Sequence, residues 1–515
     1  MGSWRGRKFF LRGRQRFPVV AWRVCLVFAV ALVLVSRPAF ADAAARLDFQ
    51  PLRALEAKGA RVSALVVDLS QGAVLASYQA DALLAPASTT KLVTAAMALD
   101  RWPANKRFVT RLFARGALRD GTLTGDLVLQ GGGDATLLDQ QLWTLAQRLY
   151  ALGLREVTGD LRVDVSRFGQ LSCGIKDRCD AQQSSLNSYD APLSALGVNY
   201  SNMAVQVAPA AKVGGAAAVA PLPFELPSLS VDARVLTDGA QDDLTAERFS
   251  LGAQNHVVLR GKVKESDQPR LLYRSIAGAE RYAGEIFAQL LRQTGITFSG
   301  AVIVESAPLP AEDLFLLELP GETLRNTLGL MLDHSNNIIA DTLALNLLVA
   351  YRQEQAEEGA SAPPAQQVAL QLPQAGLLLQ GFLRDAVAAS RFSGDQASQS
   401  RLFDGSGLTP ENRLSSRDLV GLLDSLYRKP ADFSVLFGNL VIPDEKNKHA
   451  ALWRENRKWQ TRLAVKTGGL TEPISVITIA GYLRFDDDRW GAFAMMVNGE
   501  PGKSINRWEA FAAME

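Results

Sequence analysis

The sequence predicts an α/β fold in which a β-rich segment interrupts one split domain. Segments with helix-like and strand-like patterns occur together near both ends of the chain, in residues 42–102 and 316–515. Residues 103–315 instead consist of short alternating segments joined by glycine-rich turns. Because 48% of the 515 residues are hydrophobic, the chain can form two or three cored domains. We therefore expect residues 103–315 to be a large β-rich insertion, divided into two subdomains by a linker near residues 205–230.

Residues 1–41 have the pattern of a secretory signal peptide. A basic stretch precedes the apolar residues 24–35, which are too few to span a bilayer, and the small residues Ala39 and Ala41 follow. We therefore expect cleavage after Ala41 and export to the periplasm, with no transmembrane segment in the mature chain. An uncleaved membrane anchor is the alternative.

Cysteine content and net charge indicate which cross-links, metal sites and partners are to be expected. Cys25 lies in the signal peptide, which leaves Cys173 and Cys179 to close a small surface loop as a disulfide in an oxidising compartment. A metal knuckle is the weaker alternative, because no histidine or second cysteine pair lies nearby. The formal net charge of +2 gives no reason to expect a nucleic acid as partner.

The mature chain starts with a predicted strand pair that leads into a helix. Residues 61–80 predict two strands around a turn at residues 70–72, and an apolar helix is expected after Pro86. Ser88 and Lys91 lie one turn apart on this helix, which is apolar on nearly every side and therefore buried. A buried lysine is either paired or neutral, and a neutral amine beside a serine is a general base for a nucleophile. The alternative is a lysine whose amine reaches the surface.

Beyond the first helix, the remaining elements follow from composition and period. Residues 211–227 are rich in small residues and proline and predict a loop, whereas residues 279–295 show the 3.6-residue period of a helix. Helices return from residue 322 onward, three strands follow within residues 462–499, and a helix over residues 505–515 ends the chain. These late elements are expected to belong to the same domain as the first strand pair.

One of the late strands contains a second lysine motif, Lys466-Thr467-Gly468, followed by Gly469. Lys466 near Lys91 would lower the pKa of Lys91 by repulsion between like charges, and would bind a substrate carboxylate. Gly468 would let a substrate backbone lie close to the strand. By itself, the motif also fits an ordinary strand that meets a turn.

A Ser-x-Asn pattern supplies the third candidate motif. It occurs at residues 185–187, 335–337 and 504–506, and the middle copy stands at the start of an apolar helix between the other two motifs. The first copy lies in a polar loop and the last one beside the terminal helix. We therefore assign Ser335 and Asn337 to the site, with a helix N-cap as the alternative role of Ser335.

Taken in chain order, Ser88-Thr89-Thr90-Lys91, Ser335-Asn336-Asn337 and Lys466-Thr467-Gly468 resemble the motifs of the penicillin-interacting serine transferases. The long interval from Ser88 to Ser335 resembles the class C, low-molecular-mass penicillin-binding proteins, the D-alanyl-D-alanine carboxypeptidase/endopeptidase family S13. The stretches GDLVLQGGGDATL, SNNIIADTLA and FDGSGLTPENRLSSRDLV resemble this family too. The resemblance implies that the split domain is a serine DD-peptidase or β-lactamase-like domain, with an antiparallel sheet flanked by helices.

The resemblance also implies the reaction. Ser88 would attack the carbonyl between two D-alanines, Lys91 would accept the serine proton, and Ser335 would pass a proton towards the leaving amine. Asn337 would hydrogen-bond the substrate backbone, and water would release the acyl-enzyme. Carboxypeptidase and endopeptidase activity share this chemistry and differ only in what the leaving amine carries.

The resemblance also implies that the strand motif, Lys466-Thr467-Gly468 followed by Gly469, binds the substrate. Lys466 and Thr467 would hold the terminal carboxylate, Gly468 would face the substrate backbone, and the N–H groups of Ser88 and Gly469 would form an oxyanion hole. The expected partners are peptidoglycan stem peptides and β-lactams. No metal ion or cofactor is expected.

Two departures from the family leave other functions open. The family usually has threonine at the position of Gly469, and residues 440–453 do not resemble its usual glycine-containing segment. A member that binds peptidoglycan without turnover, or a β-lactamase, is therefore the alternative.

Asp190 is a candidate contact for the free amine of a diaminopimelate side chain, with an ordinary surface loop as the alternative. A homodimer and a peripheral association with the membrane or the cell wall also stay open.

Overall fold

The structure is a computed structural model that describes residues 49–514, except residues 172–173, 253, 309, 311, 359–369, 396 and 444–456. The predicted signal peptide and its cleavage site after Ala41 lie outside the described residues. Cys173 and most of the segment 440–453 lie outside them as well.

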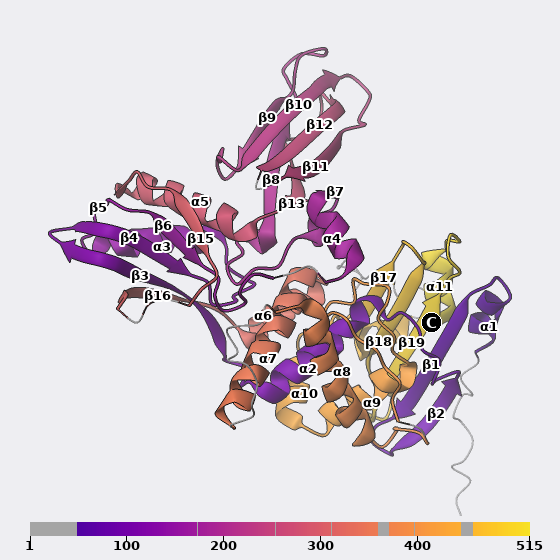
Figure 1. Ribbon diagram of the computed structural model, residues 1–515. Helices are drawn as coiled ribbons and strands as arrows, with labels where there is room; N and C mark the ends of the chain where they lie inside the picture. Colours follow the sequence, from indigo (N-terminus) through magenta and orange to yellow (C-terminus); the bar gives the residue numbers. More distant parts are fainter. Residues whose placement is uncertain are drawn as a thin grey trace, which may run out of the picture. The chain divides into compact units, whose positions relative to one another are not determined.

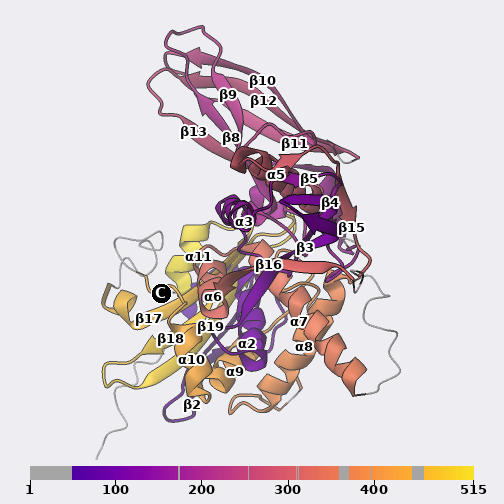
Figure 2. The same ribbon diagram turned by 90° about the vertical axis from the view of Figure 1, so that its left-hand side faces the viewer.

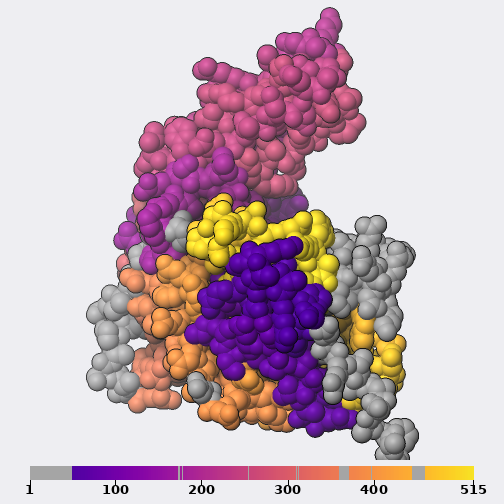
Figure 3. Space-filling view, turned by 90° about the vertical axis from the view of Figure 1, so that its right-hand side faces the viewer, coloured from indigo at the N-terminus to yellow at the C-terminus, as the bar shows by residue number. Residues whose placement is uncertain are grey.

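A five-stranded antiparallel sheet brings the two ends of the described chain together (Figure 1). Its strand order is β17–β18–β19–β1–β2, with β1 (Arg61–Asp68) beside β19 (Trp490–Asn498). The other three strands are β2 (Ala73–Tyr78), β17 (Leu463–Leu470) and β18 (Val476–Arg484). In Figure 3, the indigo N-terminal surface lies against the yellow C-terminal surface. The expected antiparallel sheet is thus confirmed, and it combines the first strand pair with the three late strands.

Helices cover both faces of this sheet, because successive side chains of each strand point to opposite sides. Val62 and Ala64 of β1 belong to a small core with α1 (Gln50–Glu56) and α11 (Arg507–Met514). Leu65 and Val67 belong to the larger core on the other face. The helices of this larger core include α2 (Lys91–Arg101), α6 (Leu324–Asp333), α7 (Asn337–Glu357), α8 (Leu372–Ala388), α9 (Ser416–Tyr427) and α10 (Pro430–Phe437).

Two of these helices, α2 and α7, carry predicted site residues at their first positions. Every residue from Asn337 to Ala350 of α7 is buried, as is every residue from Lys91 to Ala96 of α2. Because both helices are apolar on almost every side, the core surrounds them and fixes their N-termini. None of the described helices is both long and apolar enough to cross a membrane.

Residues 107–323, here called the insertion, begin and end in one seven-stranded sheet. Strand β3 (Arg107–Arg119) pairs with β4 (Thr122–Gln130) and with β16 (Leu314–Thr323). The shorter strands are β5 (Glu156–Val157), β6 (Leu161–Asp164), β14 (Thr297–Phe298) and β15 (Val302–Glu305). Helices α3 (Asp139–Ala151) and α5 (Ala279–Thr294) pack together beside these strands (Figure 2), and α5 lies where the 3.6-residue period predicts a helix.

Two smaller sheets complete the insertion, with strand orders β10–β12–β11–β7 and β13–β8–β9. Their strands are β7 (Ser184–Ser185), β8 (Asn202–Ala208), β9 (Ala218–Leu222), β10 (Leu229–Asp238), β11 (Thr245–Leu251), β12 (Gln254–Lys264) and β13 (Arg270–Ser275). The predicted loop over residues 211–227 was wrong in part, because it contains β9. This strand is at the edge of its sheet, where Pro221 is tolerated although it lacks an N–H donor.

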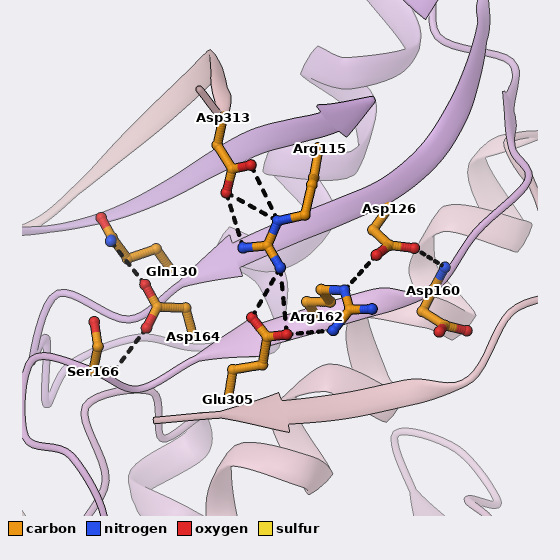
Figure 4. Close-up of polar contacts among 9 residues, drawn as sticks. All are labelled: Arg115, Asp126, Gln130, Asp160, Arg162, Asp164, Ser166, Glu305 and Asp313. Carbon is orange, nitrogen blue, oxygen red and sulfur yellow. Dashed lines mark hydrogen bonds and ion pairs between the residues drawn. The ribbon is translucent and has the colours of Figure 1, made fainter. Parts of the chain in front are cut away.

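Charged side chains form a network on the seven-stranded sheet (Figure 4). Arg115 of β3 is paired with Asp313 at 2.9 Å and with Glu305 of β15 at 3.2 Å. Arg162 of β6 binds the same Glu305 and also Asp126 of β4. Apart from the buried carboxylate of Asp313, these side chains are only partly buried, so the network stabilises the local sheet modestly and belongs to the structure of the insertion.

Candidate active site

The candidate nucleophile, Ser88, lies on a tight turn that runs directly into a helix. Residues Ala87–Thr90 form the 3-10 turn η1, and α2 begins at Lys91. Ala87 has a φ of 46°, a left-handed conformation that non-glycine residues adopt rarely and often at functional sites. Thr90 Oγ1 donates a hydrogen bond of 2.8 Å to the carbonyl of Ala87 and holds the turn closed. Ser88 is therefore fixed one 3-10 turn before Lys91, on the same side.

Lys91 is fully buried, and its amine lies beside the hydroxyl of Ser88. Its Nζ is 2.9 Å from Ser88 Oγ, 2.7 Å from Asn337 Oδ1 and 2.7 Å from the carbonyl oxygen of Ser406. Burial removes the ammonium group from water and lowers the pKa of Lys91 to about 7. At neutral pH, a substantial fraction of Lys91 is therefore the neutral amine.

The two other acceptors decide how this neutral amine is oriented. A neutral amine has two hydrogens and one lone pair, whereas Asn337 Oδ1 and the Ser406 carbonyl oxygen can only accept hydrogen bonds. Both hydrogens of Lys91 are therefore used by these two oxygens, at 2.7 Å each. The lone pair is left to face Ser88 Oγ, whose hydroxyl then donates to the amine. This is the arrangement that a general base needs.

Three buried charged groups surround this amine. The carboxylates of Asp341 and Asp404 raise the pKa of Lys91, and the guanidinium of Arg178 lowers it. We expected Lys466 to be the cation that lowers this pKa, which was wrong, because burial is the main cause and Arg178 is the cation. Lys466 is not among the charges that act on Lys91, and it instead binds the hydroxyl of Ser335.

Ser335 and Asn337 sit where α6 ends and α7 begins, and they reach the two different lysines. Ser335 has a φ of 54° and is not the N-cap of α7, because Asn336 accepts the capping hydrogen bond from the N–H of Ile339. Lys466 Nζ donates to Ser335 Oγ at 3.0 Å. The three predicted motifs therefore meet at one site, with Lys91 linking Ser88 to Asn337 and Lys466 linking β17 to Ser335.

The strand motif lies against the nucleophile turn. A Cβ atom at Gly468 would lie 2.8 Å from the backbone N of Ser88 and 2.3 Å from Thr478 Oγ1, closer than real Cβ contacts allow. Thr478 Oγ1 in turn donates to the carbonyl of Pro86 at 2.8 Å. Gly468 is thus needed for the approach of β17 to the turn. Thr467 is half-buried and Gly469 is exposed, as expected for positions on an edge strand that a substrate can reach.

A buried loop that we did not assign to the site supplies the second acceptor of Lys91. Asp404 accepts hydrogen bonds from the N–H of Gly407 at 2.7 Å and of Thr409 at 3.0 Å, and from Asn412 Nδ2 at 2.7 Å. These bonds fold the loop so that the carbonyl of Ser406 faces Lys91. The stretch FDGSGLTPEN resembles the family in the sequence, but its residue types do not indicate that a backbone carbonyl is the functional group.

Two further predictions involve residues of the insertion. Asp190 lies in the short turn η2 (Ser188–Asp190), where it accepts hydrogen bonds from Ser185 Oγ at 2.7 Å and Asn187 Nδ2 at 3.2 Å. It lines a small cleft together with Arg178, and its contact with a substrate stays a prediction.

Cys179 is disulfide-bonded, but Cys173 lies outside the described residues, so this pairing also stays a prediction. In the part of the chain that the structure describes, no group of three His, Cys, Asp or Glu side chains is placed to hold a metal ion.

Comparison with known proteins places this site in a family. The chain is 24% identical to D-alanyl-D-alanine carboxypeptidase DacB of Haemophilus influenzae over 371 residues, which cover 72% of each chain. It is 28% identical to a D-alanyl-D-alanine carboxypeptidase of Actinomadura sp. over 456 residues, 86% of this chain and 79% of that one. The crystal structure of penicillin binding protein 4 from Haemophilus influenzae has the same fold, with a TM-score of 0.70 at 20% identity, over 88% of this chain and 95% of that one.

The family model for the D-Ala-D-Ala carboxypeptidase 3 (S13) family matches residues 50–514, which include every element described above. The match contains all three motifs and the insertion between the first two. It also agrees with the resemblance that the motifs indicate. The chain belongs to the D-Ala-D-Ala carboxypeptidase 3 (S13) family.

Proposed function

We propose that this chain is a serine D-Ala-D-Ala carboxypeptidase that cleaves peptidoglycan stem peptides through an acyl-serine intermediate. Membership of the S13 family gives the enzyme class, a serine peptidase. The observation that carries the proposal is the 2.9 Å distance between Ser88 Oγ and the amine of the fully buried Lys91. Ser88 has a base beside it and is itself only half-buried.

In the acylation step, Ser88 Oγ attacks the carbonyl carbon between two D-alanine residues while the lone pair of Lys91 accepts the hydroxyl proton. The negative charge moves to the carbonyl oxygen, where the N–H groups of Ser88 and Gly469 would stabilise it. Loss of one such donor typically costs about 10²–10³ in rate. Collapse of the tetrahedral intermediate then breaks the C–N bond and leaves an ester on Ser88.

Protonation of the leaving amine is the role of Ser335. Lys466 donates to Ser335 Oγ at 3.0 Å, which orients this hydroxyl so that its own proton is free for the amine. Lys466 and Thr467 would bind the terminal carboxylate of the substrate. The amide nitrogen of Asn337, whose oxygen Lys91 already uses, would donate to a substrate carbonyl. The proton that Lys91 took from Ser88 passes to Ser335 in place of the one given to the amine, so Lys91 is neutral again. Water then attacks the ester with Lys91 as base, and Lys91 returns a proton to Ser88 Oγ as the acid leaves.

The same serine would be acylated by β-lactams, which gives the decisive experiment. The mature protein and its Ser88→Ala variant are incubated with benzylpenicillin and examined by intact-mass spectrometry, while D-Ala release from a pentapeptide is measured in the same samples. We expect an adduct and D-Ala release from the wild type alone. An adduct without release would favour a silent peptidoglycan-binding member, whereas loss of the drug without a lasting adduct would favour a β-lactamase. No acylation of the wild type would refute the role of Ser88.

Whether the enzyme also acts as an endopeptidase depends on the leaving amine. A cross-linked muropeptide dimer assayed beside the pentapeptide separates the two activities, and we expect both to be cleaved. Asp190 would contact the free amine of the diaminopimelate side chain. Asp190→Asn should then raise KM for a substrate with this amine free, and leave KM unchanged for the N-acetylated substrate.

The exported state of the mature chain is part of the same proposal, because the expected substrate lies outside the cytoplasm. Cleavage after Ala41 would place Asp42 at the mature N-terminus, which N-terminal sequencing of protein from the periplasmic fraction tests. A homodimer and a peripheral association with the membrane or the cell wall also stay predictions. Native mass spectrometry and fractionation of intact cells address these two points.

A further inference from the structure

A short helix of the insertion reaches the buried charges beside the general base. Helix α4 (Lys176–Gln183) carries Arg178, whose side chain is 7% exposed. The guanidinium of Arg178 forms an ion pair with Asp341 of α7 and donates to Ser406 Oγ at 3.2 Å. An arginine this deeply buried needs such partners, because an unpaired buried charge is costly.

Asp341 and Ser406, which bind Arg178, also hold the loop that orients Lys91. Asp341 Oδ1 accepts a hydrogen bond of 2.9 Å from the N–H of Gly405, and the carbonyl of Ser406 accepts one of 2.7 Å from Lys91 Nζ. Arg178 therefore fixes the peptide segment 405–406 from both sides, through the Asp341 carboxylate and through the Ser406 hydroxyl. The carbonyl that this segment presents is one of the two acceptors that turn the Lys91 lone pair towards Ser88.

Helix α4 is itself held firmly, by the fully buried Arg248 of β11. Arg248 donates to the carbonyls of Ala181 and Gln182 at the end of α4, at 2.6 and 2.7 Å. It also donates to Ser275 O and Ser275 Oγ at 3.0 Å each, and to Ser250 Oγ at 2.9 Å. All five donors of this guanidinium are used. A cation at a helix C-terminus is also electrostatically favourable, so α4 is a rigid support for Arg178.

We propose that Arg178 is a positioning residue for the acylation step, which holds the Ser406 carbonyl and the Asp341 carboxylate in place and so keeps Lys91 aimed at Ser88. The inference rests on the proposed function, because it requires Lys91 to be the base. In this way the insertion contributes a side chain to the organisation of the active site, although the catalytic motifs lie outside it.

The charges around Lys91 predict how the loss of Arg178 would differ from ordinary destabilisation. The amine faces Asp341 from α7, Asp404 from the following loop and Arg178 from α4, and Arg178 alone lowers the pKa of Lys91 among the three. Without Arg178, the two carboxylates remain, and the pKa of Lys91 rises from about 7. Lys91 then becomes neutral only at higher pH. The acid limb of the pH–rate profile, in which the acylation rate rises with pH, therefore moves to higher pH.

The test compares Arg178→Met, Arg178→Lys and the control Arg162→Met in the full mature chain. Arg162 also bridges two carboxylates in the insertion (Figure 4), and neither Arg162 nor these carboxylates are among the charges that act on Lys91. The second-order acylation rate with a fluorescent penicillin is measured between about pH 5.5 and 9.5, together with the melting temperature. We expect Arg178→Met to shift the acid limb up by about one unit, which costs about tenfold at pH 6.5 and little at pH 9.

The conservative variant and the control separate charge from packing. Arg178→Lys keeps a cation that can bind Asp341 but not Ser406 as well, so its acid limb should stay in place while its rate falls by about two- to fivefold at every pH. Arg162→Met should lower the melting temperature and leave the pH profile unchanged. In an Arg178→Met background, Asp341→Asn should move the acid limb back, because it removes the unbalanced carboxylate.

An Arg178→Met variant with the wild-type acid limb, or an Arg178→Lys variant shifted as far as Arg178→Met, would overturn the inference. If Arg178→Met does not fold, an unchanged rate of Arg178→Lys at every pH overturns it as well. A wild-type protein that is not acylated at Ser88 would instead refute the proposed function, so the two failures are distinguishable.

Discussion

Adding a single methyl group to the strand beside the nucleophile is the sharpest test of this geometry. In Gly468→Ala, the new Cβ atom would lie 2.3 Å from Thr478 Oγ1, 2.8 Å from Ser88 N and 2.9 Å from Pro86 O. Two of these three atoms belong to the backbone of the turn that carries the nucleophile. Because each distance is below 3.0 Å, the turn or the strand has to move.

The expected losses of acylation rate and of stability depend on how far the nucleophile turn or the strand is displaced. A displacement of about 1 Å between nucleophile and substrate site costs about 10²-fold in rate, and distortion of the oxyanion hole adds to it. Overpacking of one methyl group in a buried contact costs about 1–3 kcal/mol of stability. The catalytic loss should therefore exceed what the loss of stability explains, since a protein destabilised by this amount remains folded at 25 °C.

The neighbouring glycine supplies a matched control. In Gly469→Ala, the nearest atom to the new Cβ would be the carbonyl oxygen of Val476 at 3.6 Å, an ordinary van der Waals distance. Acylation by a fluorescent penicillin and thermal unfolding are measured for both variants. We expect a loss of about 10²-fold or more for Gly468→Ala and less than threefold for Gly469→Ala. Equal rates for the two variants would show that β17 does not lie against the nucleophile turn as described.

Three further predictions follow from the same site. Because Lys91 accepts a proton only as the neutral amine, the acylation rate should rise with pH through about 7 and level off above it, and a flat profile between about pH 5 and 9 would contradict this role. Ser335→Ala should lower D-Ala release by about 10²–10⁴-fold, whereas Ser504→Ala, in an exposed copy of the Ser-x-Asn pattern, should not alter it. Gly469→Thr should melt at the wild-type temperature, because the new Cβ would make only an ordinary van der Waals contact with the Val476 carbonyl oxygen at 3.6 Å. It should lower KM for a D-Ala-D-Ala peptide by about tenfold through one added hydrogen bond to the carboxylate, and an unchanged KM argues against this contact.

Sequence patterns predicted those parts of the fold in which local chemistry decides the structure. The first strand pair and the late strands form as expected, and β1 is buried on both faces because one side chain in two enters each core. The buried helix after Pro86 also forms, although its first turn is the separate 3-10 turn that carries Ser88. Strand β9 was missed because small residues and proline resemble a loop, and only its partner β8 makes it a strand.

The same distinction holds within the site. Ser88, Lys91, Ser335 and Lys466 could be predicted because their reactive groups occur in short motifs, and the structure brings these motifs together. The contact of Asn337 with Lys91 could not be read from the sequence, since the motif suggests a substrate contact and says nothing of which oxygen is already used. The backbone carbonyl of Ser406 was equally hidden, because any residue type can supply it.

The groups that tune Lys91 were beyond prediction for a physical reason. A buried carboxylate or guanidinium acts on a neighbouring amine through distance and low dielectric, and these depend on the folded chain and not on spacing in the sequence. Arg178, Asp341 and Asp404 come from three separate segments, and each resembles an ordinary surface charge where it stands in the sequence. Our expectation that Lys466 would lower the pKa of Lys91 was wrong for this reason. Lys466 is the cation that the sequence motifs contain, but Arg178 is the cation that acts on Lys91 in the folded chain. A charged residue outside the motifs can therefore change the pKa of a lysine within them, and it is found only when the buried charges are followed from partner to partner.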